Sequence, residues 1–227
     1  MKVALLLPFK NDLDILQYTL PKIPHELFDE LIFLDTGSTD GSNDLIKKTF
    51  DNPHIIYDKI TELNWGRWRT MLMNRAKDLG CDWVFMLDSD ETLFKESYEK
   101  LIAYMKHEAS TLYRLARVNF CAKGMWSQEF YPDWQARVMK LDAGYYYNDR
   151  LHAQPKLDGK IAEGQFLPEI QIFHFGWVRD PEKFTLKQLN YKRTQQGKPV
   201  LDKLPAGVKV RSSGHEKTGK LWLGLTP

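Results

Sequence analysis

The chain has 227 residues, enough to bury one substantial hydrophobic core, and we expect one catalytic domain with an appendage rather than two equal domains. Hydrophobic residues make up 43% and charged residues 27% of the sequence, a balance that excludes a disordered or fibrous protein. The formal net charge of +2 is too small to indicate a polyanionic partner by itself, although it leaves nucleic acid open.

Short apolar segments alternate with amphipathic ones in the first half of the chain. Apolar runs that end at turns predict buried strands at 3–7, 31–34, 54–57 and 83–87. Capping residues and helical periodicity predict a short helix after Asp12 and further helices at 43–50, 67–79 and 95–107. This alternation indicates an α/β fold with a mostly parallel central sheet and helices on both faces, in which ligands bind beyond the carboxyl ends of the strands.

The second half of the chain has a different pattern. Strands are predicted at 112–118, 136–141 and 170–173, without helices between them. Asp180 and Pro181 form a suitable N-cap and first-turn pair for a helix that runs to about Thr194 and stops near Gly197. From residue 198 onward Pro, Gly, Ser and Lys dominate, so we expect a loosely packed basic tail over 198–227.

The cysteines and the N-terminal apolar run bear on the cellular compartment. Cys81 and Cys121 are far apart and lack any metal-ligand or redox spacing, so neither a disulfide framework nor a zinc site is predicted. The run at 3–7 ends at Pro8 and is too short for a signal peptide or a membrane span, and no other segment is long enough. We therefore expect a cytoplasmic protein without a transmembrane segment.

The strongest chemical signal is the segment 83–91, Trp-Val-Phe-Met-Leu-Asp-Ser-Asp-Glu, in which an apolar strand delivers carboxylates to the edge of the sheet. Side chains two residues apart on an extended backbone project the same way, so Asp88 and Asp90 can converge on one cation. Oxygen ligands suit Mg²⁺ or Mn²⁺, which would bridge phosphates and neutralise charge on a departing nucleoside diphosphate. An isolated pair of this kind is more often two solvated acids, but the buried strand and a second acidic loop favour the metal.

The second acidic loop spans residues 35–42, after the second predicted strand. The carboxylate of Asp35 can accept hydrogen bonds from a ribose or a base, and Gly37 lets the backbone approach a ligand closely. The loop lacks the glycine spacing of a phosphate-cradling motif, so we assign it to base and ribose rather than to phosphate.

Together these segments resemble the inverting glycosyltransferases of family 2, which have the A-type nucleotide-sugar fold. The resemblance rests on Leu-Pro-Phe-Lys-Asn-Asp at 7–12, Leu-Asp-Thr-Gly-Ser-Thr-Asp-Gly-Ser at 34–42, and Met-Asn-Arg-Ala at 73–76 leading to the acidic strand end at 82–91. It covers about the first 95 residues, and weaker pieces that look like later family elements lie at 137–139, 150–152 and 173–176. It implies a nucleotide-sugar-binding half over 1–110 and an acceptor-side half over 111–197, before the basic tail.

The resemblance also implies roles for single residues. Pro8 and Asp35 would line the nucleoside pocket, and Arg69 or Arg75 would approach the base or a phosphate. Asp88 would serve the diphosphate as well as the metal. Uridine diphosphate (UDP) sugars are the commonest donors of such relatives, so the resemblance implies a hexosyltransferase that uses a UDP-sugar with Mn²⁺ or Mg²⁺.

Family members invert the anomeric centre in a single displacement, which requires a carboxylate to deprotonate the acceptor hydroxyl. Asp133, in Tyr-Pro-Asp-Trp at 131–134, is our first choice for this base, and Glu129 is the second. Many relatives have His-Glu where this chain has His152 and Ala153, so that carboxylate is missing here.

Two aromatic side chains complete the candidate site. His174 follows an apolar strand and is a candidate third metal ligand, as a late histidine is in some relatives, although its phenylalanine neighbours also suit a core role. Trp134, next to the candidate base, is the tryptophan assigned to stacking on a sugar or a base.

Two functions of other classes stay open. Residues 87–92 also match the hydrophobic-Asp-x-Asp-x-Thr motif of haloacid-dehalogenase-type phosphatases, in which Asp88 would be phosphorylated and Asp90 would be the acid. The second acidic pair that those enzymes need is missing after Glu91. The same fold is also compatible with a non-catalytic module that binds nucleotides, glycans or nucleic acid.

Basic residues gather near the end of the chain and bear on the acceptor. They lie on the last predicted helix, just beyond it and in the tail: Lys183, Lys187, Lys192, Arg193, Lys198, Lys203, Lys209, Arg211, Lys217 and Lys220. Such a surface suits a phosphate-rich acceptor, although a charge run is usually a solvated face. The acceptor itself, whether a glycan, a lipid-linked sugar, a protein or DNA, is not identified by the sequence.

Overall fold

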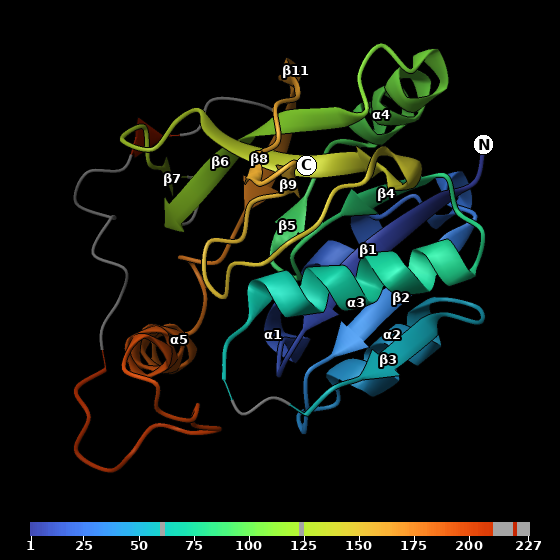
Figure 1. Cartoon of the computed structure of the whole chain (residues 1–227). Coiled ribbons are helices and arrows are strands. Elements are labelled where there is room, and N and C mark those ends of the chain that lie inside the picture. The colour runs from blue at the N-terminus through green and yellow to red at the C-terminus, as the bar shows by residue number, and fades with distance from the viewer. Residues whose placement is uncertain (60–61, 123–124, 211–219, 222–227) are drawn as a thin grey trace.

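The computed structural model describes residues 1–59, 62–122, 125–210 and 220–221. Its centre is a parallel sheet whose strands are, in spatial order, β3 (His54–Tyr57), β2 (Glu30–Asp35), β1 (Val3–Phe9) and β4 (Trp83–Met86). Every residue of β1 is buried, as its uninterrupted apolar sequence requires of a strand covered on both faces. The carboxyl ends of the four strands therefore meet at one edge of the sheet (Figure 1).

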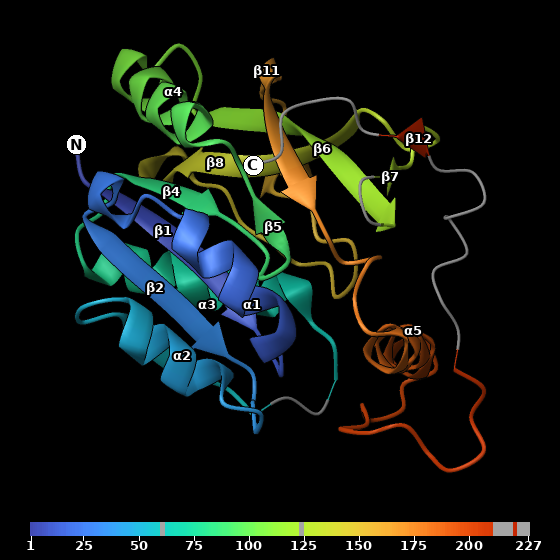
Figure 2. The same ribbon diagram turned by 180° about the vertical axis from the view of Figure 1, so that it is seen from behind.

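Helices cover both faces of this sheet. The helices are α1 (Leu13–Thr19), α2 (Ser42–Thr49), α3 (Trp65–Asp78), α4 (Lys95–His107) and α5 (Pro181–Gln195), with short 3-10 turns at Leu20–Lys22, His25–Leu27 and Leu141–Ala143. Figure 1 shows α3 on one face, and the reverse view in Figure 2 shows α1 and α2 on the other. The α/β fold class predicted from the sequence is confirmed.

Alternate residues of β1 feed two separate hydrophobic cores. Leu5 and Leu7 pack under α1 and α2, together with Phe33 and Phe85 of the neighbouring strands. Leu6 faces the opposite way and packs under α3. Because successive side chains of a strand point to opposite faces of the sheet, β1 packs against helices on both faces. This packing fixes the positions of the loops at the carboxyl edge.

The second half of the chain extends the sheet with a mixed region. Its strands are β5 (Glu91–Thr92), β6 (Leu112–Ala122), β7 (Met125–Trp126), β8 (Asp133–Lys140), β9 (Lys156–Leu157), β10 (Lys160–Ile161), β11 (Gln165–His174) and β12 (Lys220–Leu221). Strand β8 pairs antiparallel with β4, β6 pairs antiparallel with β8, and β11 runs parallel to β6. The long strands were predicted with shorter bounds, and the two-residue strands carry too little sequence to show a period.

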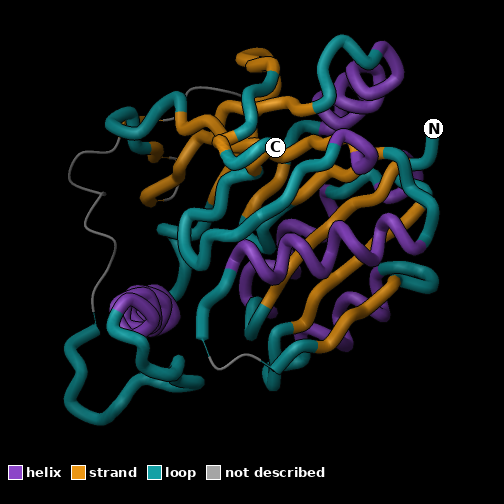
Figure 3. Tube along the Cα trace, in the orientation of Figure 1, coloured by secondary structure: helices purple, strands orange, loops and turns teal. Residues whose placement is uncertain are grey.

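Helix α5 lies apart from the sheet, and loops connect it to the rest of the chain (Figure 3). The predicted tail does not begin as loose chain, because Asn190 of α5 exchanges two hydrogen bonds with the backbone of Leu201 and Lys10 forms a 2.7 Å ion pair with Asp202. Arg211 and Lys217 of the predicted basic tail lie outside the described residues. No helix in the described part of the chain is long and apolar enough to cross a membrane.

Candidate active site

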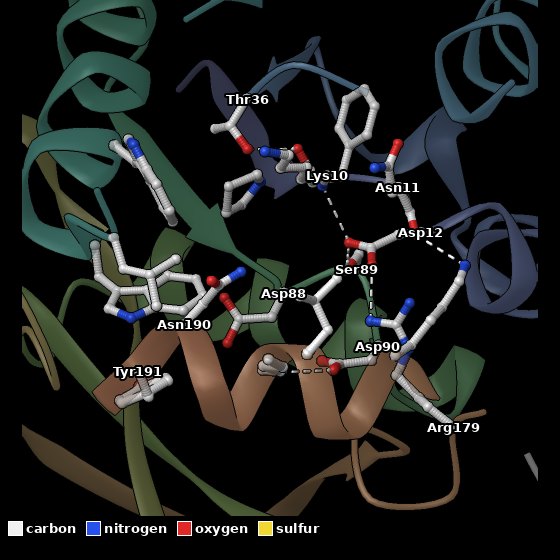
Figure 4. A pocket seen from close by; sticks show the side chains of 18 of the residues that line it. Lys10, Asn11, Asp12, Thr36, Asp88, Ser89, Asp90, Arg179, Asn190 and Tyr191 are labelled. Atoms are coloured by element: carbon white, nitrogen blue, oxygen red, sulfur yellow. Dashed lines mark hydrogen bonds and ion pairs between the residues drawn. The ribbon is translucent and has the colours of Figure 1, made fainter. Parts of the chain in front are cut away.

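A cavity of about 900 Å³ opens at the carboxyl ends of the central strands. Its walls come from the loops after β1 and β2, the start of α3, the segment after β4, strand β8 and helix α5. The predicted site residues that line it are Pro8, Arg69, Asp88, Asp90, Asp133, Trp134 and His174. Figure 4 shows Asp88 and Asp90 between the loop after β1 and the helix that carries Asn190 and Tyr191.

Three predicted residues do not line the cavity. Oδ1 of Asp35 accepts hydrogen bonds of 3.0 and 2.7 Å from backbone N–H groups of its own loop, so this carboxylate holds the turn. Arg75 lies 3.3 Å from His54, the first residue of β3, which places it at the end of the sheet opposite the cavity. Glu129 is exposed and outside the cavity lining. The assignments of Asp35 to the nucleoside, of Arg75 to base or phosphate and of Glu129 to catalysis stay predictions, made for residues that lie outside the cavity lining.

The Asp88 carboxylate is held by a buried arginine. Its Oδ2 accepts a 2.8 Å hydrogen bond from Nη2 of Arg137, and its Oδ1 lies 4.0 Å from Nη2 of Arg69. Burial raises the pKa of Asp88, but Arg137 and Arg69 outweigh it and lower the pKa to about 2. Asp88 is therefore a fixed anion at the floor of the cavity.

A chain of charges connects Asp88 to Asp133. Arg137 also donates a 2.6 Å bond to Glu91, whose side chain is fully buried, and Glu91 accepts a 3.2 Å bond from Arg117. Arg117 then donates two bonds, of 2.8 and 2.6 Å, to Oδ2 of Asp133. Burial raises the pKa of Asp133, but Arg117, Asn119 and Gln135 together lower it below its usual value, so Asp133 is ionised at neutral pH.

Asp90 is the more deeply buried of the two acids that follow β4, with 4% of its side chain exposed. Its Oδ1 lies 3.5 Å from Nε2 of His174, and its Oδ2 lies 3.5 Å from Nζ of Lys187 on α5. Burial raises the pKa of Asp90, while the charges of Lys187 and His174 bring it well below the usual range. Asp90 is thus a buried anion facing two basic groups.

The hydrogen-bond network assigns the tautomer of His174. The side-chain amide of Asn119 donates a 3.1 Å bond to Asp133, so its oxygen must be the atom that lies 2.7 Å from Nδ1 of His174. Nδ1 therefore carries a proton, and Nε2, 3.5 Å from Oδ1 of Asp90, is the ring nitrogen that is left to accept a cation. Two acceptors facing each other leave room for a cation between them, either a proton or a metal ion.

Several observations fit a divalent metal bound together with a diphosphate. Oδ1 of Asp88 is buried without a hydrogen-bond partner, and a Cβ built on Gly176 would lie 2.7 Å from Asp90, so the glycine keeps space open beside this carboxylate. Among the described residues no group of three or more His, Cys, Asp or Glu side chains could hold a metal alone. Mg²⁺ in nucleotide sites is typically held by one or two carboxylates plus substrate phosphates, and two carboxylates are what this site offers.

A second set of contacts joins the loops around the cavity. Ser89, between the two acids, donates a 2.6 Å bond to Oδ2 of Asp12 after β1. Oδ1 of the same Asp12 forms a 2.7 Å ion pair with Arg179, just before α5 (Figure 4). These contacts connect the segment after β4, the loop after β1 and the residues just before α5, and they keep Asp88 and Asp90 in fixed positions.

Sequence reasoning missed several residues of this site: Asp12, Glu91, Arg117, Asn119, Arg137 and Arg179. It also missed that Lys187 faces Asp90. One signal was present in the sequence, because Lys183 and Lys187 are spaced four residues apart on the last predicted helix and such spacing places side chains on one helix face. The pairing partners were not predictable, because 46 residues separate Arg137 from Glu91 in the chain.

Most of the chain is similar in sequence to known glycosyltransferases. The family model described as glycosyl transferase family 2 matches residues 5–158. The SPbeta prophage-derived glycosyltransferase SunS of Bacillus subtilis (strain 168) is 22% identical over 155 residues, which cover 66% of this chain and 34% of SunS. The uncharacterized glycosyltransferase MG060 of Mycoplasma genitalium is 28% identical over 119 residues, which cover 48% and 40%. The chain thus spans about a third to two fifths of the length of these curated relatives.

Solved structures share the fold. TarS of S. aureus matches with a TM-score of 0.54 at 16% identity, over 85% of this chain and 39% of TarS. A shorter TarS, residues 1–349 in complex with UDP-GlcNAc, matches with a TM-score of 0.52 at 16% identity, over 81% of this chain and 63% of that chain. At this level of identity the likeness establishes the architecture alone, and it agrees with the A-type fold expected from the sequence.

Proposed function

The chain belongs to glycosyl transferase family 2, and on that basis we propose that it transfers a sugar from a nucleotide diphosphate donor to an acceptor hydroxyl, with inversion at the anomeric carbon. The observation that carries the proposal is the cavity at the carboxyl strand ends, which is lined by two fixed carboxylates, Asp88 and Asp90, and by a third, Asp133. In α/β sheets of this kind, ligands bind at that edge.

The proposed reaction is a single displacement. The acceptor oxygen bonds to the anomeric carbon as the bond from that carbon to the diphosphate oxygen breaks, and the electron pair leaves with the nucleoside diphosphate. The hydroxyl proton passes to Asp133, which the neighbouring Arg117 keeps ionised. Asn119 and Gln135 also donate hydrogen bonds to this carboxylate, which orients it.

Asp88 and Asp90 would hold Mn²⁺ or Mg²⁺ together with the donor's phosphates, and His174, whose Nε2 lies 3.5 Å from Oδ1 of Asp90, would lie beside the ion. A bound divalent ion supplies Lewis-acid neutralisation of the charge that develops on the leaving diphosphate. Arg69, which lines the cavity and lies 4.0 Å from Asp88, adds a fixed positive charge beside the phosphates. Pro8 and the adjoining loop residues would contact the nucleoside.

We propose UDP-sugars as the donors, because TarS 1–349, which shares the fold, has been solved with UDP-GlcNAc. The acceptor is not identified by the cavity. The phosphatase alternative is set aside, because the chain belongs to a glycosyltransferase family and Oδ2 of Asp88, the supposed nucleophile, is engaged by Arg137.

The test is to measure UDP release from a panel of UDP-sugars with Mn²⁺, with a generic phosphomonoester as the parallel substrate. The proposal expects UDP from at least one sugar donor and no phosphate from the phosphomonoester. Phosphate release would indicate the phosphatase. Donor binding without turnover toward water or any acceptor in a glycan panel would indicate a binding module.

A further inference from the structure

Basic side chains of the last helix and of the residue pair before it line the cavity and form ion pairs with acids of other segments. Arg179 forms a 2.7 Å ion pair with Asp12, and Lys183 forms one of the same length with Asp14. These pairs fasten the beginning of α5 to the segment after β1. At the other end of the helix, Thr194 accepts a 3.3 Å hydrogen bond from the backbone of residue 63. Helix α5 is therefore fixed at both ends across the cavity, and its middle faces the acidic loop after β4.

Lys187 occupies that middle position, and its contact differs from those of its two neighbours. Its Nζ lies 3.5 Å from Oδ2 of Asp90, which is longer than a good charged hydrogen bond, and 38% of its side chain is exposed. This is its one ion pair among the described residues. An ammonium group has three donors, so Lys187 retains capacity for a second acceptor inside the cavity.

We propose that Lys187 changes partner when the donor binds: it neutralises Asp90 in the metal-free protein, and it binds the donor's diphosphate once a metal occupies Asp90. This inference rests on the proposed function. A divalent ion and an ammonium group compete for the same carboxylate, and the ion displaces the ammonium more readily when another anion is at hand for the ammonium. The diphosphate that arrives with the metal is that anion.

The exchange makes metal binding and nucleotide binding cooperative. Metal alone must displace Lys187 without giving it a new partner, and nucleotide alone meets two carboxylates, Asp88 and Asp90. Each ligand therefore improves the site for the other, and the improvement is reciprocal by linkage. Lys187 contributes to this cooperativity in two ways, because it lowers the affinity for metal alone and raises the affinity for the diphosphate.

Calorimetric titration of Lys187→Met separates the two contributions. Mn²⁺ alone should bind this variant about two- to fivefold more tightly than the parent, because the competing cation is gone. UDP at saturating Mn²⁺ should bind about tenfold more weakly, because a charged hydrogen bond to the diphosphate is lost. Lys187→Arg, which keeps the charge, should retain UDP affinity within about threefold of the parent.

The matched control is Lys192→Met on the same helix, because Lys192 is exposed and does not line the cavity. It should leave both affinities unchanged. Unchanged affinities in Lys187→Met, or changes of the same sign, would overturn the partner exchange while leaving the glycosyltransferase proposal standing. If the parent itself fails to bind UDP with Mn²⁺, the proposed function falls, and this inference falls with it.

Discussion

Arg137 donates a 2.8 Å hydrogen bond to Asp88, although its side chain is almost completely buried in the centre of the molecule. Burial lowers the pKa of Arg137, but Asp88 and Glu91 outweigh it and raise the pKa above the usual value. The guanidinium therefore stays charged in the interior. It compensates two carboxylates, one at the cavity floor and one fully buried.

Arg137→Met should destabilise the protein strongly, because it removes the positive charge nearest to both Asp88 and the fully buried Glu91. Breaking a buried pair in this way typically costs about 3–5 kcal/mol, and urea unfolding measures the loss. Arg67→Met is the control, since the ion pair of Arg67 with Asp58 involves an arginine that is 55% exposed and should contribute less than about 1 kcal/mol. Equal losses in the two variants would contradict the compensating role of Arg137.

Acid should destabilise the folded state in a window set by Asp88. Its folded pKa of about 2 lies below that of an unfolded aspartate, so the unfolded chain takes up the proton first as the pH falls. The free energy of unfolding should therefore hold above about pH 5 and decline from about pH 4 toward pH 2. Asp88→Asn should show a shallower decline than the parent in urea melts across this range. If the free energies of unfolding of the parent and of Asp88→Asn fall equally with pH, Asp88 does not contribute to the decline.

If Asp133 is the catalytic base, its replacement should lower turnover without changing the affinity for the donor. Asp133→Asn should lower turnover by roughly a hundred- to ten-thousandfold, while calorimetric affinity for the donor stays close to that of the parent, because the proton belongs to the acceptor. Glu129→Gln is the control and should keep full turnover, since Glu129 is exposed and outside the cavity. Near-parental turnover of Asp133→Asn with a lowered melting temperature would make Asp133 structural.

The pH dependence of kcat/KM should report on Arg117 as well. Arg117 keeps the pKa of Asp133 below its usual value, so the acid limb of the parent should lie below about pH 4. Removing the arginine in Arg117→Met should move that limb to higher pH. A limb that does not move would show that another group governs it, provided that thermal melting confirms a folded variant.

How much the sequence could predict differs between the strands and the site. Apolar runs located β1 to β4, and the carboxylate spacing after β4 placed Asp88 and Asp90 at a ligand-binding edge, because both features depend on local pattern. The structure also brings His174 and Asp133 to the same cavity, linked through Asn119. Of the two arginines that the resemblance offered, Arg69 lines the cavity and Arg75 lies beside the start of β3. The sequence could not distinguish them, because the direction of a helix relative to the sheet edge is a tertiary feature.

The basic helix shows the same limit. Its lysines were grouped as one surface for a phosphate-rich acceptor, yet Lys187 faces Asp90 whereas Lys192 is exposed. A list of charges along a helix does not state which of them meet buried acids from distant loops. That division depends on where α5 crosses the cavity, which the pairs at its two ends decide.

The most direct test of the account is a titration of UDP into the parent, Asp88→Asn and Asp90→Asn, with and without Mn²⁺. The parent should bind UDP tightly only with Mn²⁺, and each variant should bind UDP at least about tenfold more weakly at saturating Mn²⁺. Mutating a residue that merely hydrogen-bonds to a metal ligand already lowers metal affinity about tenfold, so the loss of a ligand itself should cost at least as much. Asp142→Asn, at a side chain that is 76% exposed, should match the parent. Equal UDP affinity in the parent and both variants, with Mn²⁺ present, would contradict a metal-assisted nucleotide site at these two carboxylates.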